Sequence, residues 1–372
     1  MGAELLKKRG IIVHPTWPTI VSVIYIIYIS LLSNLLPDYR VSENLQSFIL
    51  LFFLIIYESR RKEILTLLPV YVSILLFTPI WMFQTFREIT SGNEYAARML
   101  SHSSDVAAEL SSQGVGGYGL IYSVMLLLPI LVSSIRNFKK IDLTKLRSII
   151  KSHSAILLIL LLTNLVMGIL LIIYAGYSIA IIIVVLSIAP ALLINRINSK
   201  QILLSIIILT VAFVVMQIFL DDVIGLINDK STTSLYLNKI SDIYDTVHGG
   251  KSAGTFADRS ERYYVSLFEF FKYPIFGTSN LNNIGGHSTY LDGFARFGFL
   301  AGLSLILLLT YVPFRFFRIM RFDMGLPLSV IITALIFPLI NTVPASFGVM
   351  LFIVFPVTCG LLLNYSENSK TR

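Results

Sequence analysis

The sequence predicts an all-α, polytopic membrane protein with about ten transmembrane helices and one large outer loop between the seventh and the eighth. Hydrophobic residues make up 55% of the 372 residues and charged residues only 13%. A soluble domain of this length could not bury so much apolar surface, whereas a lipid bilayer accepts it. The apolar residues form long runs, and the basic residues gather in alternate short loops between those runs.

Ten apolar runs reach or approach the roughly 20 residues that a helix needs to cross ~30 Å of hydrocarbon. They lie at 17–36, 45–57, 64–83, 118–135, 155–174, 178–194, 202–220, 290–313, 326–342 and 346–363. The second run is short, so it is a less tilted span, a span extended through its polar flanks, or a partly re-entrant segment. The first run lacks a small-residue cleavage site and is interpreted as a span.

The basic residues fix the orientation of these spans. They precede the first span and follow the second, fourth, sixth and eighth: Lys7, Lys8, Arg9; Arg60, Arg61, Lys62; Arg136, Lys139, Lys140, Lys145, Arg147, Lys151; Arg196, Lys200; Arg315, Arg318, Arg321. The positive-inside rule places these loops and both termini in the cytoplasm. The chain then divides into seven helices at 1–220, a large outer loop at 221–289, and three helices with a cytoplasmic tail at 290–372.

Composition also excludes several kinds of function. The net charge of +8 would suit nucleic-acid binding, but the basic residues mark the cytoplasmic loops instead, so no nucleic-acid partner is expected. The single cysteine, Cys359, allows neither a disulfide nor a thiolate metal site within the chain. The GVGGYG run at Gly114–Gly119 has the spacing of a dinucleotide fingerprint. Because no strand precedes it, it is interpreted as a flexible turn or a site of close helix packing.

The stretch from Ala257 to Gly302 holds the residues best suited to chemistry. Within it, the segment YYVSLFEFFKY at 263–273 is aromatic and apolar with one Glu and one Lys. This composition favours a segment that lies in the membrane interface with its rings at the headgroup level. Pro274 ends the segment and Gly277 turns the chain, and a link rich in Asn and Gly then leads to His287 and the eighth span.

Cations gather in this region, although the positive-inside rule makes them sparse on the outer side. They are Lys251, Arg259, Arg262, Lys272 and Arg296. Guanidinium groups bind phosphate oxygens bidentately, so a phosphate-bearing lipid is the natural ligand. The alternative is that the arginines reach lipid headgroups or pair with nearby carboxylates. Those carboxylates are Asp258, Glu261, Glu269 and Asp292. Arg296 lies within the predicted eighth span, where a charge costs about 2.5 to 3.5 kcal/mol, so a function or a defined partner is expected.

His287 is the candidate general base, since a neutral imidazole can accept a proton from a hydroxyl near neutral pH. The alternative is a cap or hydrogen-bonding group at a helix start. Asp221 and Asp222 close the seventh span and could bind a divalent cation, although such a pair more often marks the interface. No His-Glu-x-x-His, Cys-x-x-Cys or Gly-Lys-Ser sequence occurs, so a mechanism without metal or cofactor is favoured.

These residues resemble the shared core of the bacterial O-antigen polymerases (Wzy) and O-antigen ligases (WaaL). The family pattern is an Arg with an aromatic residue four positions on, a Pro-x-x-Gly, a His followed by Ser or Asn and by Tyr-Leu, and a glycine-punctuated helix. The matching residues are Arg259, Tyr263, Pro274, Gly277, His287, Ser288, Tyr290, Leu291 and Gly298. They span fewer than about fifty residues. Tyr263 stands where most members have Trp, and Arg296 where many have Glu.

The resemblance implies a GT-C-like glycosyltransferase of the bacterial inner membrane, with its active site facing the periplasm. The donor would be an undecaprenyl-diphosphate-linked oligosaccharide, transferred with inversion to the non-reducing end of another lipid-linked repeat unit. His287 would activate the acceptor hydroxyl, and Arg259 would stabilise the diphosphate. Arg262, Arg296, Tyr263, Tyr290 and Lys251 would complete the substrate-binding set. Expected partners are membrane lipids and a chain-length regulator, the polysaccharide co-polymerase.

Three other functions stay open at this point. A ligase would use the same donor but transfer the glycan to the lipid A core; the modest length and ten or so spans favour the polymerase. A flippase or transporter would place charged groups along a path at mid-membrane, whereas here they collect on one face. A structural partner in a glycan-assembly complex would not need the side chains of His287 and Arg259.

Overall fold

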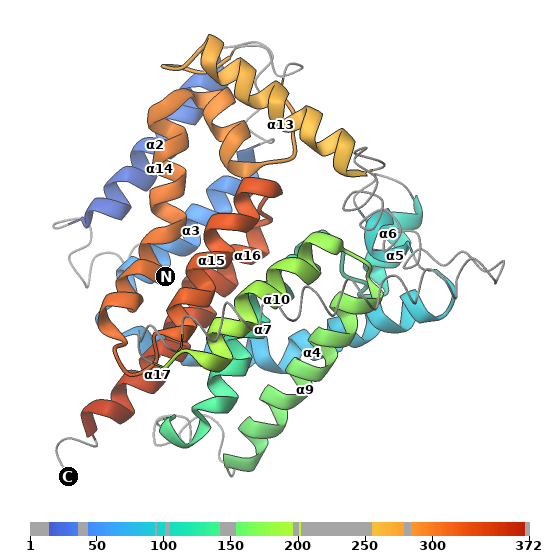
Figure 1. The fold of residues 1–372 in the computed structure, drawn as a ribbon, viewed down its shortest axis with the longest axis vertical. Helices are drawn as coiled ribbons and strands as arrows, with labels where there is room; N and C mark the ends of the chain where they lie inside the picture. The colour runs from blue at the N-terminus through green and yellow to red at the C-terminus, as the bar shows by residue number, and fades with distance from the viewer. Residues whose placement is uncertain are drawn as a thin grey trace. The chain divides into compact units, whose positions relative to one another are not determined.

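The computed structural model describes residues 15–35, 44–93, 95–100, 105–141, 154–195, 201, 255–278 and 284–368 (Figure 1). Every regular element in these ranges is helical, and they contain no strand. The chain divides into two compact units, each built from separate segments. Unit 1 comprises Met1–Tyr71, Arg259–Phe316 and Ala334–Leu361, and unit 2 comprises Val72–Asp258, Phe317–Thr333 and Leu362–Arg372.

The helices have the length and composition of a multi-pass membrane protein. Five are long and apolar enough to cross a membrane: Ile64–Thr90, Tyr118–Arg136, Ala155–Tyr174, Thr289–Ile319 and Ala345–Leu363. Three shorter apolar helices are Trp17–Leu32, Ile179–Leu193 and Gly325–Ile340. Each predicted run within the described ranges falls in helical elements to within a residue or two, whereas 202–220 lies outside those ranges. The number of spans, the loop layout and the three-part division of the chain stay predictions.

In unit 1, α3 (Leu45–Arg60) packs against α2 (Trp17–Leu35), α16 (Ala345–Val349) and the π-helical turn η5 (Met350–Val354). The unit also contains η2 (Ile64–Leu67), most of α13 (Thr255–Lys272) and α14 (Thr289–Ile319), the end of α15 (Gly325–Ile340) and the start of α17 (Phe355–Asn368). Gly348 allows the close packing of α16 on α3, because a Cβ there would lie 3.3 Å from the Cα of Leu50.

In unit 2, α7 (Tyr118–Arg136) packs against α9 (Ser154–Tyr174) and α10 (Ser178–Leu193) and is buried along most of its length. The unit also contains most of α4 (Leu68–Thr90), with α5 (Ala96–Met99), α6 (Asp105–Ser112) and η3 (Phe138–Lys140). Gly168 brings α9 close to α7, since a Cβ there would lie 2.9 Å from Cδ2 of Leu128. A helix that is apolar on all sides, like α7, needs such neighbours on all sides.

The GVGGYG run leads into the first residues of α7 and packs against α4. The Gly116 amide donates a hydrogen bond to Thr85 Oγ1 at 2.7 Å. Gly114 has a φ of 79°, and a Cβ at this position would lie 2.1 Å from Oε1 of Gln84. The glycines therefore serve close approach to a helix, which is one of the two interpretations that the sequence allowed.

Two prolines inside helices leave a backbone carbonyl without its helical donor, and a polar side chain from another helix supplies the missing hydrogen bond. In unit 2, Pro79 cannot donate to the Leu75 carbonyl, which accepts from Asn164 Nδ2 at 2.9 Å instead. In unit 1, Pro338 likewise frees the Ala334 carbonyl, and the Tyr290 hydroxyl donates to it at 2.6 Å. Within hydrocarbon such a side-chain donor is needed, because no water is present to donate to the carbonyl.

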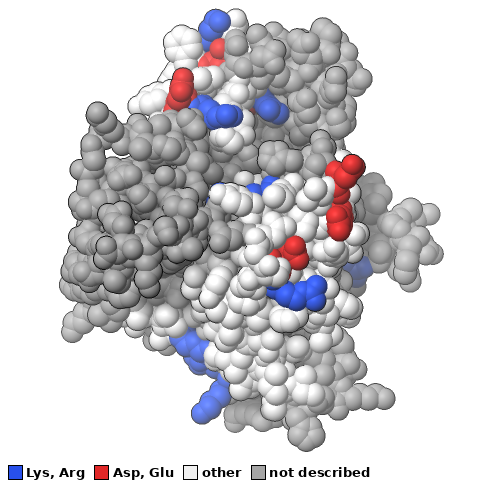
Figure 2. Space-filling view, turned by 90° about the vertical axis from the view of Figure 1, so that its right-hand side faces the viewer, with Lys and Arg blue, Asp and Glu red and all other residues white. Residues whose placement is uncertain are grey.

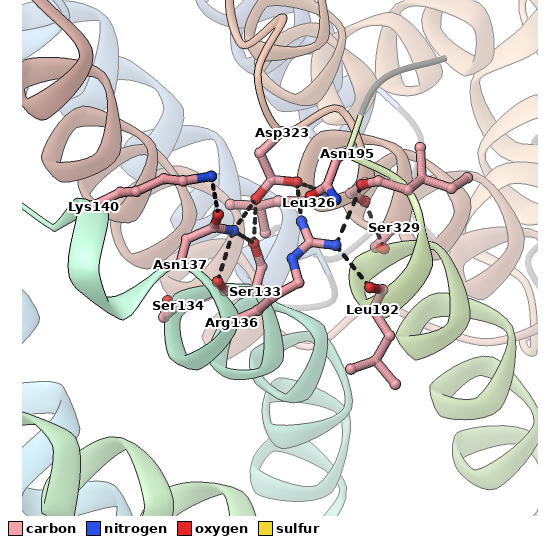
Figure 3. Close-up of polar contacts among 12 residues, drawn as sticks. Ser133, Ser134, Arg136, Asn137, Lys140, Leu192, Asn195, Asp323, Leu326 and Ser329 are labelled. Carbon is pink, nitrogen blue, oxygen red and sulfur yellow. Dashed lines mark hydrogen bonds and ion pairs between the residues drawn. The ribbon is translucent and has the colours of Figure 1, made fainter. Parts of the chain in front are cut away.

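A buried ion pair joins three segments of unit 2 (Figure 3). Asp323, fully buried, accepts from the Arg136 guanidinium and from Ser133 Oγ and Asn137 Nδ2, the latter two at 2.7 Å. Arg136 also donates to the Leu192 carbonyl at 3.0 Å. The contacts connect the ends of α7 and α10 with the segment before α15. Asp323 thus has a charged partner and hydroxyl and amide donors, as a buried carboxylate requires.

The described surface is largely uncharged. In Figure 2 the described part of one face is mostly white, and its Lys, Arg, Asp and Glu side chains lie in small groups. Large apolar side chains are exposed in the middle of helices of both units, including Ile24 (59%), Phe77 (55%) and Val166 (54%). Such exposure would be unfavourable in water, whereas lipid tails accommodate it.

Candidate functional site

The predicted site residues that the structure describes lie on α13, on the segment before α14, and on α14 itself, which carries Tyr290 and Arg296. Arg259, Arg262 and Tyr263 are carried by α13, and His287 lies in the short segment 284–288 that leads into α14. Figure 1 shows α13 running crosswise over one end of α14. Only the backbone position of Arg259 is described. Lys251, Asp221 and Asp222 lie outside the described residues.

The α13 helix packs with its polar side inward. Ser266 (0% exposed) and Glu269 (4%) are buried, whereas Tyr264 (73%), Phe268 (72%) and Phe271 (69%) are exposed. A surface helix in water shows the opposite arrangement, with its apolar stripe toward the core. An aromatic face of this size needs an apolar neighbour, which agrees with the predicted position at the membrane interface.

Asp292 is the polar centre of the buried seam between α13 and α14. Its Oδ1 accepts from Ser266 Oγ at 2.6 Å and from the Gly286 amide at 3.3 Å, and its Oδ2 accepts from the Ser288 amide at 3.0 Å. The carboxylate therefore binds the backbone on both sides of His287. Ser266 Oγ also accepts from the Gly285 amide at 2.9 Å. We call this set, Asp292 with Ser266, Gly285, Gly286 and Ser288, the Asp292 clamp.

The same segment contacts α13 at Arg262. A Cβ on Gly285 would lie 2.1 Å from the Arg262 carbonyl oxygen, so only glycine allows this approach. The Arg262 guanidinium, on an exposed residue, donates to the Gly285 carbonyl at 3.4 Å. The structure thereby brings Arg262 against Gly285, two residues before His287, in the segment that carries the candidate base.

Ser288 is the N-cap of α14. Its Oγ accepts from the Leu291 amide at 3.0 Å, and the Asp292 carboxylate returns to the Ser288 amide, in the manner of a capping box. Serine and asparagine are among the best N-cap residues. Ser288 therefore starts the helix directly after His287, the candidate base.

Other hydrogen bonds attach this part of unit 1 to the end of α15. The Tyr263 hydroxyl donates to the Ile340 carbonyl at 2.6 Å, and the Ser288 hydroxyl donates to the Pro338 carbonyl at 3.2 Å. Tyr290 is 3% exposed, with its hydroxyl on Ala334. The structure gives both tyrosines a packing role, and their contacts with substrate stay predictions.

The α14 helix is broken at Gly298, whose φ of 77° and ψ of −176° are not helical. The turn at 274–278 fills the break: the Phe299 amide donates to the Pro274 carbonyl, and the Thr278 amide to the Ala295 carbonyl, both at 2.8 Å. A Cβ on Gly298 would lie 2.0 Å from the Ile275 carbonyl oxygen. The Thr278 hydroxyl donates to Glu269 at 2.7 Å, so the turn is also bound to α13.

The break changes the interpretation of Arg296. The predicted eighth span, 290–313, is not one continuous helix, because its first part ends before Gly298. The unbroken part at 299–319 is about 30 Å long at a rise of 1.5 Å per residue and is sufficient to cross hydrocarbon. Arg296, which is partly exposed, precedes this part. The cost of a charge at the centre of a span is therefore not a reason to assign it a function.

Asp292 and Ser266 were not among the predicted site residues. The sequence signal for Ser266 is its position on the Arg259, Arg262 and Glu269 side of α13, and for Asp292 it is the spacing of four from Ser288.

Within the described ranges, no group of three or more His, Cys, Asp or Glu side chains is placed to bind a metal ion. No model of a known protein family matches the sequence, and no curated protein matches it.

Proposed function

We propose that this protein is an O-antigen polymerase of the bacterial inner membrane, a glycosyltransferase that acts at the periplasmic face on undecaprenyl-diphosphate-linked glycans. The observation that supports this most directly is the contact between the segment of His287 and the arginine side of α13, through Gly285 and Arg262. A base for the acceptor and a cation for the donor diphosphate are then carried by two segments that contact each other.

The reaction needs one proton transfer and one displacement. His287 accepts the proton of the acceptor sugar hydroxyl, and the oxygen attacks the anomeric carbon of the donor glycan from the side opposite the diphosphate. The carbon–oxygen bond to the diphosphate breaks, and its electron pair leaves with undecaprenyl diphosphate. Arg259 and Arg262 stabilise the negative charge on the leaving group, and the configuration at the anomeric carbon is inverted.

The exposed aromatic face of α13 supports a lipid-linked donor. Tyr264, Phe268 and Phe271 lie on the side of the helix opposite to Ser266 and Glu269, and Ile275 (66%) and Phe276 (69%) continue the apolar surface into the turn. A helix in the membrane interface would present its arginines at headgroup depth, where a polyprenyl diphosphate has its charge. The chain-length regulator and the other membrane lipids stay expected partners in this proposal.

Two alternatives share this site. An O-antigen ligase would use the same donor chemistry with the lipid A core as acceptor. A flippase or transporter would bind the same lipid without breaking a bond. Gel electrophoresis of surface lipopolysaccharide from a strain lacking the protein separates these functions. A single repeat on the core identifies a polymerase, whereas a core with no repeat and polymer on the lipid carrier identifies a ligase.

The decisive variant is His287→Ala, expressed in that strain beside the wild type and the control Glu261→Gln. Glu261 is exposed on α13 and has no place in the proposed chemistry. We expect the wild type and Glu261→Gln to restore the ladder and His287→Ala to leave single repeats at an unchanged protein level. A full ladder with His287→Ala would exclude His287 as the base. Repeat units that stay on the cytoplasmic side of the membrane in the deletion strain would favour the flippase.

A further inference from the structure

We propose that Asp292 is the positioning residue of this site, which keeps His287 against the arginine side of α13 while leaving the guanidinium groups to the diphosphate. The inference rests on the proposed function and adds a residue that neither contacts the reacting atoms nor follows from the family pattern. It is carried by the Asp292 clamp, in which one carboxylate binds both neighbours of His287 and a serine of α13.

The donors of the clamp are all neutral. Both oxygens of Asp292 accept hydrogen bonds, from two backbone amides and one hydroxyl, and the side chain is buried with 9% exposure. A buried carboxylate needs several donors in place of water, and three are supplied here. The negative charge of Asp292 is therefore stabilised by three bonds, none of which uses an arginine guanidinium.

The clamp acts on the position of His287 through the backbone. Gly286 and Ser288 are its neighbours in the chain. Fixing both of their amides therefore fixes the backbone position from which the imidazole side chain extends. Gly285, one residue earlier, is held on Ser266 and Arg262. Because Ser266 lies one helical turn after Arg262, the clamp sets the spacing between the base and the cation. A displacement of about 1 Å of a catalytic group can reduce the rate roughly 100-fold.

A second buried carboxylate on the same seam provides a matched control. Glu269 accepts the Thr278 hydroxyl and belongs to the turn at 274–278, not to the His287 segment. Glu269→Gln keeps an oxygen acceptor for that hydroxyl. Asp292→Asn cannot keep all its bonds: an amide group has one oxygen, so its NH2 would face either the Ser288 amide or the Ser266 and Gly286 donors.

The test uses the purified full-length protein in vesicles, with lipid-linked repeat units extracted from cells that lack it. For Asp292→Asn we expect kcat to fall about 10- to 100-fold with the KM for the lipid-linked unit unchanged, since the arginines are untouched. For Glu269→Gln we expect kcat within about two-fold of the wild type. Ser266→Ala, which removes one of the three bonds to Asp292, should give an intermediate kcat.

Hydrogen exchange of the peptide over 284–291 gives a second readout that does not depend on catalysis. We expect faster exchange in Asp292→Asn and wild-type exchange in Glu269→Gln. Faster exchange of this peptide in Asp292→Asn with a wild-type kcat would overturn the positioning role. Unchanged exchange in Asp292→Asn would overturn the clamp itself. If His287→Ala retains full turnover, the proposed base is wrong, and an exchange result in favour of the clamp then shows a structural contact only. If Asp292→Asn does not fold, Ser266→Ala decides by the same two measurements.

Discussion

At the residue scale, this protein uses hydroxyl groups to satisfy acceptors that its own helices leave open. Tyr290 donates to a carbonyl freed by Pro338, Tyr263 to the last carbonyl of α15, and Ser266 to a buried carboxylate. Each acceptor is buried or lies at a helix end, where the cost of leaving it without a donor is of the order of 1–3 kcal/mol. Residues that a motif marks as functional can therefore be required by the fold.

A double-mutant cycle between Tyr290 and Pro338 tests this role. Tyr290→Phe should lower the free energy of unfolding by about 1 kcal/mol, since the Ala334 carbonyl loses its donor. In a Pro338→Ala background the restored backbone amide can bond that carbonyl, so Tyr290→Phe should cost much less. Denaturant unfolding in detergent measures both, with the exposed Tyr264→Phe as a neutral control. If Tyr290→Phe lowered the free energy of unfolding equally in both backgrounds, the role of the Tyr290 hydroxyl would not depend on Pro338.

The sequence identified Arg262 and His287 as candidate site residues, but it did not identify the contacts that join α13 to the segment of His287. The arginines and the histidine are rare types in an apolar chain, so they are conspicuous. Asp292 and Ser266 are ordinary polar residues, and their importance depends on the approach of Gly285 to α13, which no spacing in the sequence predicts. Asp292 could only be considered as a partner of arginines, whereas its bonds come from amides and a hydroxyl.

At the element scale, the two helices that carry the site each depart from the ordinary pattern. The polar side of α13 faces the protein, and α14 is interrupted where an ordinary span would be continuous. Hydropathy predicted the apolar run of α14, and the composition of 263–273 predicted that this part of α13 lies at the interface. It did not predict the break, because a glycine within an apolar run has the same hydropathy whether its backbone is helical or not. Discontinuous helices are tolerated at a membrane only where other groups satisfy the freed backbone, as the turn at 274–278 does.

Two glycines of α14 provide a paired test of the break. Gly298→Ala should destabilise the protein by at least 1–3 kcal/mol, because its φ of 77° suits glycine and a Cβ would meet the Ile275 carbonyl. Gly293→Ala should be neutral or stabilising by up to about 1 kcal/mol, since its nearest contact, Leu305 Cδ2 at 3.6 Å, is ordinary. Thermal unfolding compares them. Equal stability of the two variants would mean that α14 can run straight through position 298.

At the scale of the whole molecule, the distribution of charge relates the site to the membrane. The positive-inside rule uses loop residues such as Arg136, yet Arg136 is bound to the buried Asp323. Lys139, three residues further along the chain, is exposed and is a better marker of the cytoplasmic side. Orientation therefore rests on many residues together, and no single basic side chain fixes it. The α13 helix should then lie on the opposite side, as the proposed periplasmic chemistry requires.

Cysteine labelling in intact cells tests this orientation. Glu261→Cys on α13 should react with a membrane-impermeant maleimide added outside once the outer membrane is permeabilised, and Lys139→Cys should react only after the inner membrane is also opened. Both positions are exposed, whereas the native Cys359 is fully buried and should contribute little background. Labelling of the wild-type protein measures that background. The reverse pattern would place α13 in the cytoplasm, and a polymerase acting at the periplasmic face would then be excluded, whatever the effect of His287→Ala.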